Sequence, residues 1–243
     1  MRLRDLESAL QCVRPFDTAV QKIELEQFPT SPHIAACVVH TAESNYGDIE
    51  DKVVLDLGTG TGMLGIGCVM MGASRVFGVD ADMDALAIAQ ANIEECEVDD
   101  TMELLLCDVS SLPIRCTGAA QIDTVIMNPP FGTRNKGIDS LFLEKAISLR
   151  PRAIYSLHKT STRKFLLKQA IRWGVKVDVL AELAFNIPKM YKMHKEKSKD
   201  VAVDLIRFEL PEEMRTPPGI PELHPHFFSE DPEQEQAGAA AEE

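Results

Sequence analysis

The sequence lacks the features that mark a membrane-spanning or secreted chain. No apolar run approaches the roughly 18 residues that a spanning helix needs. Residues 1–7 read MRLRDLE, which places acidic side chains where a signal peptide needs an apolar stretch. We therefore expect neither membrane association nor secretion.

The chain also lacks paired cysteines and clustered histidines. Its cysteines are scattered and none stands in a C-x-x-C pair, so the sequence predicts neither a disulfide framework nor a bound metal. Scattered free thiols are typical of a reducing compartment, the cytosol or the nucleus. The six cysteines are Cys12, Cys37, Cys68, Cys96, Cys107 and Cys116.

What is present is the composition of a soluble globular protein. The chain has 243 residues, 45% apolar and 26% charged, which suits one large domain or two small ones. The net charge of −13 is unevenly spread: residues 1–131 carry 21 acids and 7 bases, whereas residues 132–199 carry 16 bases and 5 acids. On composition alone, this basic block is either a solvated surface or a footprint for phosphate groups.

Short apolar runs alternate with helix-like stretches from residue 51 onward, which indicates β-α units and a parallel sheet. The predicted strands span residues 53–57, 75–79, 103–107, 124–127 and 153–157. The predicted helices span residues 31–40, 62–71, 82–96, 141–149 and 161–173. Two further β-rich runs, 176–185 and 201–210, leave no room for a helix between them. We expect them to pair as an antiparallel hairpin at the end of the sheet.

A glycine-rich turn follows the first predicted strand. Residues 53–62 read VVLDLGTGTG, so a buried strand runs into glycines at alternate positions. Glycine lets the backbone turn sharply, and the N–H groups at the following helix start face a ligand on the turn. A dinucleotide site would space its glycines G-x-G-x-x-G. The spacing G-x-G-x-G resembles instead the first motif of class I S-adenosylmethionine-dependent methyltransferases.

Two acidic residues that end the next two strands fit the same site. Asp80 can accept hydrogen bonds from both hydroxyls of a ribose. Asp108 holds the position from which the acid of that superfamily meets the adenine amino group. The alternative, a plain β-α turn with surface acids, does not account for the three features together. The cofactor-binding residues that the resemblance implies here are Asp56, Gly58, Gly60, Thr61, Gly62, Asp80, Asp108 and Val109.

The fourth predicted strand runs directly into a candidate catalytic peptide. In open parallel sheets, ligands bind beyond the carboxyl ends of the strands, where this peptide stands. It resembles the (Asn/Asp)-Pro-Pro-(Phe/Tyr) signature of enzymes that methylate planar exocyclic or amide nitrogens. The candidate catalytic residues are Asn128, Pro129, Pro130 and Phe131.

The chemistry explains these residue types. An adenine amino nitrogen is a poor nucleophile because its lone pair is delocalised into the ring. The Asn128 side-chain oxygen and the Pro129 carbonyl can each accept one N–H of the amine and draw that pair out of the plane. Catalysis is then mostly orientation and electrostatic stabilisation, with no general base. Phe131 would stack on the base, a contact worth about 1–3 kcal/mol.

Further segments resemble the eukaryotic methyltransferase-like 5 family, which methylates adenine N6 in small-subunit (18S) ribosomal RNA. They are residues 25–30, 32–36, 123–132, 155–159 and 203–208 within a resemblance that covers residues 3–210. It implies an α/β, Rossmann-like sheet of seven mostly parallel strands, one of them antiparallel, with helices on both faces. It also implies S-adenosyl-L-methionine as cofactor, with Gln27 and Thr30 closing over it.

The resemblance suggests three regions of the chain and a cellular location. Residues 1–50 are expected to form a helical cap over the cofactor site, and residues 51–210 the methyltransferase domain. Residues 211–243 hold nine acids and few large apolar groups, which predicts a disordered tail. A ribosomal RNA substrate implies the nucleus, with its nucleolus, and the cytoplasm.

The basic block supports an RNA substrate. Its charges fall after strand ends, so three loops should open on the catalytic face as a rim that tracks phosphates. The predicted RNA-binding residues are Arg134, Lys136, Lys159, Arg163, Lys164, Lys189, Lys192, Lys195 and Lys197. Two alternatives stay open: a protein glutamine-N5 methyltransferase, whose amide needs the same two acceptors, and a non-catalytic RNA-binding scaffold.

The third predicted strand, residues 103–107, suggests a protein partner. It reads ELLLC and stands at the sheet edge in the methyltransferase strand order, where an open apolar edge invites pairing. A well-packed edge strand is the simpler interpretation. The resemblance implies a small zinc-binding activator subunit that extends the sheet at this strand and forms a heterodimer.

Overall fold

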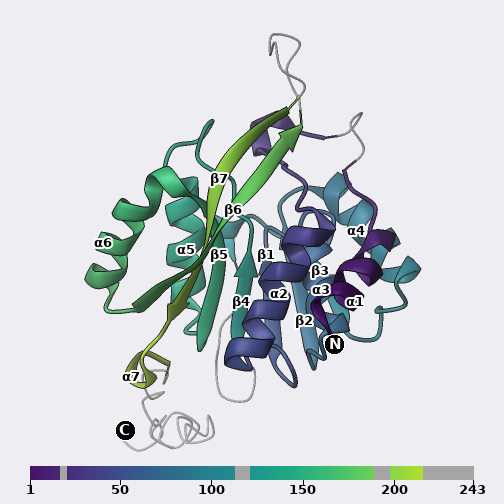
Figure 1. Cartoon of the computed structure of the whole chain (residues 1–243), viewed down its shortest axis with the longest axis horizontal. Helices are drawn as coiled ribbons and strands as arrows, with labels where there is room; N and C mark the ends of the chain where they lie inside the picture. The colour runs from purple at the N-terminus through teal and green to yellow at the C-terminus, as the bar shows by residue number, and fades with distance from the viewer. Residues whose placement is uncertain (17–20, 113–120, 189–197, 216–243) are drawn as a thin grey trace, which may run out of the picture.

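The computed structural model describes residues 1–16, 21–112, 121–188 and 198–215 (Figure 1). Seven strands form one sheet in the order β3-β2-β1-β4-β5-β7-β6. Neighbouring strands are parallel except where β7 pairs with β5 and with β6. The strands are β1 (Val53–Leu57), β2 (Arg75–Asp80), β3 (Met102–Leu106), β4 (Thr124–Met127), β5 (Ala153–Lys159), β6 (Lys176–Pro188) and β7 (Ser198–Glu209). The predicted sheet and its terminal hairpin are confirmed.

Helices cover both faces of this sheet. In Figure 1, the purple α1 and the blue α2 lie in front of the blue strands, whereas α5 and α6 lie on the green side of the sheet. The α-helices are α1 (Leu3–Ala9), α2 (Pro32–Tyr46), α3 (Met63–Met70), α4 (Met83–Glu95), α5 (Ile138–Ser148), α6 (Arg163–Trp173) and α7 (Glu212–Arg215). Short 3-10 turns are η1 (Leu10–Cys12), η2 (Ile23–Leu25), η3 (Val109–Ser111) and η4 (Thr160–Thr162). Within the described residues, no helix combines the length and the apolarity needed to cross a bilayer.

The alternation of side chains along each strand builds two cores. In β1, Val54 points to the face that α1, α2 and α3 cover, whereas Leu55 and Leu57 point to the face that α5 and α6 cover. Both cores hold fully buried aliphatic side chains from at least four strands. A strand buried on both faces reads as a continuous apolar run, which is why the sequence pattern located these strands.

Helix boundaries differ from the sequence prediction for local reasons. The Ser31 hydroxyl accepts a hydrogen bond from the Ile34 N–H (3.3 Å) and starts α2 as expected. The helix then continues six residues beyond the predicted end and stops at Gly47, whose φ of +61° suits glycine. Residues 216–243, most of the predicted disordered tail, lie outside the described residues.

A buried polar cluster joins the end of α2 to the antiparallel strands. Asp48 is fully buried, and its carboxylate accepts hydrogen bonds from the Tyr155 hydroxyl (2.6 Å) and from the Arg207 guanidinium (3.1 Å). Arg152 also pairs with this carboxylate. Burial, with the hydrogen bond to Asp48, raises the pKa of the Tyr155 hydroxyl well above its ordinary value. The cluster fixes the pairing of β5 with β7.

We expect Arg207→Met to destabilise the fold by about 3 kcal/mol, because it removes one partner of a fully buried carboxylate. Urea unfolding at neutral pH measures this. Arg75→Met is the matched control: Arg75 pairs with Glu103 at the surface, and its removal should cost at most about 1 kcal/mol. Equal losses for the two variants would contradict this account of the cluster.

Candidate active site

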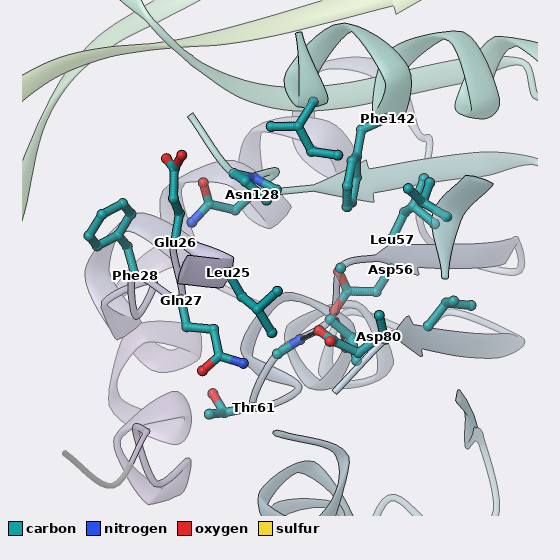
Figure 2. Close-up of a pocket in the computed structure, with 18 of the residues that line it drawn as sticks. Leu25, Glu26, Gln27, Phe28, Asp56, Leu57, Thr61, Asp80, Asn128 and Phe142 are labelled. Atoms are coloured by element: carbon teal, nitrogen blue, oxygen red, sulfur yellow. Dashed lines mark hydrogen bonds between the residues drawn. The ribbon is translucent and has the colours of Figure 1, made fainter. Parts of the chain in front are cut away.

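A cavity of about 260 Å³ opens at the carboxyl ends of the parallel strands. It lies where β1 has a neighbour on each side, β2 and β4, which is where ligands bind in open α/β sheets. Figure 2 shows parts of its wall: Asp56, Leu57 and Asp80 from the sheet on one side, and residues 26–28 on the other. The predicted site residues that line it are Gln27, Thr30, Asp56, Gly58, Gly60, Thr61, Asp80, Asp108, Val109, Asn128 and Pro130.

The glycine turn forms the floor of the cavity. The N–H groups of Gly58 and Thr59 donate to the Val79 carbonyl (2.8 and 2.9 Å), which holds the turn against β2. Gly58 has a φ of +76°, and a Cβ there would come within 3.0 Å of the Phe142 ring. Position 58 therefore requires glycine, both for its positive φ and because the Phe142 ring leaves no space for a side chain.

Asp56 shapes the turn from below. Its carboxylate is buried and accepts hydrogen bonds from the Thr59 hydroxyl (2.7 Å) and from the Gly65 N–H (2.8 Å) at the start of α3. Burial raises the pKa of Asp56 to about 7, although both hydrogen bonds favour the charged form. Asp56 therefore closes the turn, and this structural role is separate from the cofactor contact that the sequence predicts.

Asp80 and Asp108 stand at the ends of β2 and β3, as predicted from the sequence. The Asp80 carboxylate accepts hydrogen bonds from the N–H groups of Gly60 (2.8 Å) and Asp82 (2.9 Å), and burial raises its pKa. Asp108 is exposed, and the Ser110 hydroxyl and N–H hold its pKa below the ordinary value. Both carboxylates thus line one cavity with their positions already set.

The cavity wall is acidic. Five carboxylate residues line it, and none of the described lining residues is a lysine, arginine or histidine. Such a wall disfavours a diphosphate and favours a ligand that carries positive charge. The acids are Glu24, Glu26, Asp56, Asp80 and Asp108.

Residues 24–30 close one side of the cavity. The Gln27 side chain donates to Asp82 (2.6 Å) and accepts from the Lys22 N–H (2.7 Å). Thr30 accepts a hydrogen bond at its hydroxyl from the Asn128 side-chain nitrogen (3.0 Å). The segment is thereby fastened both to the start of α4 and to the candidate catalytic peptide.

That last bond sets the orientation of the Asn128 amide. Because the nitrogen is directed to Thr30, the Asn128 side-chain oxygen is left buried and without a partner in the described structure. A buried acceptor without a donor is costly, which points to a donor that arrives with a ligand. Figure 2 shows the amide at the wall of the cavity.

The Phe131 ring lies behind the cavity wall. It is only 6% exposed, stacks on Phe28 (centroids 6.0 Å apart) and meets Phe185 edge-on (5.7 Å). Phe28, not Phe131, lines the cavity. The stacking of Phe131 on a base therefore stays a prediction that requires Phe28 to move.

Glu26 is a site residue that the sequence analysis missed. It is 5% exposed and has a φ of +52°, and one carboxylate oxygen accepts from the Arg134 N–H (2.7 Å), just after the catalytic peptide. Its other oxygen is buried without a partner in the described structure. A strained backbone around a buried acid is typical of a functional position. Its sequence signal was only its place inside LEQFPT.

The predicted basic rim is partly described. Lys159 lies with its ammonium 5.9 Å from the centre of the Phe131 ring, beside the catalytic peptide. Arg163 donates to Asp204 (2.6 Å) and Glu182 (2.7 Å), so its guanidinium is paired with acids of the protein itself, although the side chain stays 33% exposed. The exposed members are Arg134, Lys136 and Lys164. The members that lie outside the described residues are Lys189, Lys192, Lys195 and Lys197.

The sheet order, the glycine turn with its strand-end acids and the Asn-Pro-Pro-Phe peptide define a class I methyltransferase. The family model for the ribosomal protein L11 methyltransferase (PrmA) matches residues 35–129. The crystal structure of the protein PH1948 from Pyrococcus horikoshii superposes with a TM-score of 0.75 at 34% identity, and covers 86% of this chain and 98% of that one. A magnesium protoporphyrin IX methyltransferase from Synechocystis, solved with bound S-adenosylmethionine, shares the fold at 17% identity and a TM-score of 0.55.

Curated relatives place the chain more narrowly. The rRNA N(6)-adenosine-methyltransferase METTL5 of Danio rerio is 50% identical over 209 residues, which are 86% of this chain and 99% of that protein. The Drosophila melanogaster relative of the same name is 48% identical over 211 residues, 86% and 97% of the two chains. The chain belongs to the METTL5 rRNA N6-adenosine-methyltransferase family.

We expect Glu26→Ala to loosen the chain that follows the catalytic peptide. The variant removes the charge-assisted hydrogen bond to the Arg134 N–H, so amide exchange in residues 132–137 should rise about tenfold. Hydrogen exchange with mass spectrometry measures this. Glu24→Ala, an exposed acid of the same segment, is the control and should leave the exchange unchanged. Equal exchange in both variants would mean that Glu26 does not hold this loop.

Proposed function

We propose that this protein transfers the methyl group of S-adenosyl-L-methionine to the N6 amine of an adenosine in small-subunit (18S) ribosomal RNA. Family membership supports the reaction class, because the relatives named above are rRNA N6-adenosine methyltransferases. The observation that carries the proposal is the unpartnered Asn128 oxygen, oriented by Thr30 at the wall of an acidic cavity. For an enzyme that methylates ribosomal RNA, we propose a location in the nucleus, with its nucleolus, and in the cytoplasm.

The lining of the cavity fits S-adenosylmethionine. A sulfonium and an ammonium carry positive charge, which a wall with five carboxylate residues and no described base favours. The glycine turn brings its backbone against two aromatic rings of the cavity wall, since a Cβ at Gly58 or Gly60 would meet Phe142 or Phe16 at 3.0 Å. Asp80 and Asp108 line the same cavity, and we propose that they accept hydrogen bonds from the ribose and from the adenine amine.

The chain's own groups then position the target amine. When bound, the cofactor supplies an electrophilic methyl group. The Asn128 oxygen accepts one N–H of the adenine amine, and the Pro129 carbonyl accepts the other. These two bonds hold the nitrogen with its lone pair directed out of the ring plane, so the peptide contributes orientation and electrostatic stabilisation. No described side chain is required to take the proton.

A basic rim is proposed to hold the RNA. The exposed Arg134, Lys136 and Lys164 follow the ends of β4 and β5, which face the same side as the cavity. Phosphate contacts of this kind position an RNA without reading its sequence. The acidic cavity would thus favour the cationic S-adenosylmethionine, and the basic loops would favour the anionic RNA.

We further propose a small zinc-binding activator subunit as partner at β3. The strand is at the sheet edge, and Leu105 and Leu106 are 37% and 47% exposed. The Cys107 N–H donates to the Asp80 carbonyl of β2, so by the alternation of a strand the Leu106 N–H faces the open edge. An added strand would pair with that N–H and cover the two leucines.

Asn128→Ala should lower kcat on ribosomal RNA about 100-fold or more, while the cofactor Kd changes less than about threefold. Tritiated methyl transfer and calorimetry measure the two quantities. Asn135→Ala, another asparagine of the cavity wall, is the control and should retain near-normal turnover. A label found in protein glutamine would favour the amide methyltransferase, and unchanged turnover in Asn128→Ala would remove the assignment of Asn128.

Leu106→Pro should abolish co-purification with the activator subunit, because proline has no N–H to offer the added strand. Leu106→Ala keeps the N–H and should retain the complex with at most a modest loss of affinity. Co-expression followed by size-exclusion chromatography measures this. If Leu106→Pro binds as the parent does, the partner does not pair with β3.

A further inference from the structure

Two cysteines that are 84 residues apart in sequence lie in contact outside the active site. The Cys12 and Cys96 sulfur atoms are 2.7 Å apart, and both thiols are free. Cys12 ends the turn η1 after α1, and Cys96 follows the last residue of α4. The described residues contain no group of three or more histidine, cysteine or acidic side chains able to hold a metal, so the pair is not part of such a site.

The surroundings of the pair favour oxidation to a disulfide. Cys12 is exposed, so a small oxidant in solution meets its sulfur first, whereas Cys96 is half-buried behind it. Burial, with the hydrogen bond to Cys12, raises the pKa of the Cys96 thiol to about 12, so Cys96 keeps its proton and Cys12 is the sulfur that meets the oxidant. A disulfide needs its sulfur atoms about 2.05 Å apart, and small side-chain rotations cover the difference.

The segment that Cys12 belongs to is attached to both α4 and the cofactor turn. The Asn92 side chain of α4 accepts from the Arg14 N–H (2.9 Å) and donates to the Arg14 carbonyl (3.0 Å) and to the Thr61 carbonyl (2.8 Å). Two residues further on, the Phe16 ring lines the cavity over Gly60. A bond between residues 12 and 96 would therefore hold Phe16 in place over the turn.

We propose that Cys12 and Cys96 are a reversible oxidation site whose disulfide clamps residues 10–16 onto α4. Hydrogen peroxide is the oxidant class that the step requires. It converts the Cys12 thiol to a sulfenic acid and releases one water. The Cys96 sulfur attacks that sulfur, the S–S bond forms, and the hydroxyl leaves with the Cys96 proton as a second water. Two thiols thus lose two electrons and two protons, and the peroxide is reduced to two waters.

The test is peptide mapping of the full chain after treatment with hydrogen peroxide and, in parallel, after reduction. We expect a cross-linked peptide pair that contains Cys12 and Cys96 and disappears with dithiothreitol. The oxidised protein should melt about 5 °C or more above the reduced one, because the bond closes a long loop. Amide exchange in residues 10–16 should also be slower in the oxidised protein than in the reduced one, since the segment can no longer detach from α4.

Single serine variants supply the controls. Cys12→Ser and Cys96→Ser should each lose the cross-link and the oxidation-dependent rise in Tm, whereas Cys37→Ser should keep both. Cys12 is exposed, so its serine variant preserves a folded protein for this comparison. Peroxide treatment that yields only sulfinic acid at Cys12, or a cross-link without any change in Tm or exchange, would overturn the proposal.

Discussion

The hydrogen bond from the Asn128 amide to Thr30 is the interaction on which the site depends. An asparagine amide presents either a donor or an acceptor, and only the acceptor can hold an amine that has two N–H groups. Thr30 selects the acceptor by taking the nitrogen at 3.0 Å. The bond also joins two parts of the chain that are 98 residues apart, the segment before α2 and the end of β4. Each must be in place before the amide is oriented.

The rest of the fold supplies those two positions. The end of β4 is fixed by its register between β1 and β5, and the buried Asp48 cluster ties β5 to β7 and to the end of α2. The segment before α2 is held from the other side by Glu26, which accepts from Arg134. Within a chain whose net charge is −13, the acidic cavity suits the proposed cationic cofactor, and the exposed bases after β4 and β5 suit the proposed anionic RNA.

Much of this architecture follows from the sequence, because strands buried on both faces and a glycine turn leave strong local patterns. The strand ends therefore placed Asp80, Asp108 and Asn128 at one edge before any contact was known. Glu26 could not be found in this way: among 38 acidic residues, nothing local distinguishes one that tertiary packing buries. The contact of Cys12 with Cys96 and the cover that Phe28 gives Phe131 are likewise set by packing between distant segments.

The most direct test of the central claim is the single-turnover rate of methyl transfer to ribosomal RNA by Thr30→Val and Thr30→Ser at saturating S-adenosylmethionine. Saturation removes any contribution of Thr30 to cofactor affinity from the comparison. The account predicts a rate about tenfold or more lower for valine, which cannot accept from the Asn128 amide, and a rate within about twofold of the parent for serine. A valine variant as fast as the parent would show that Thr30 does not orient Asn128.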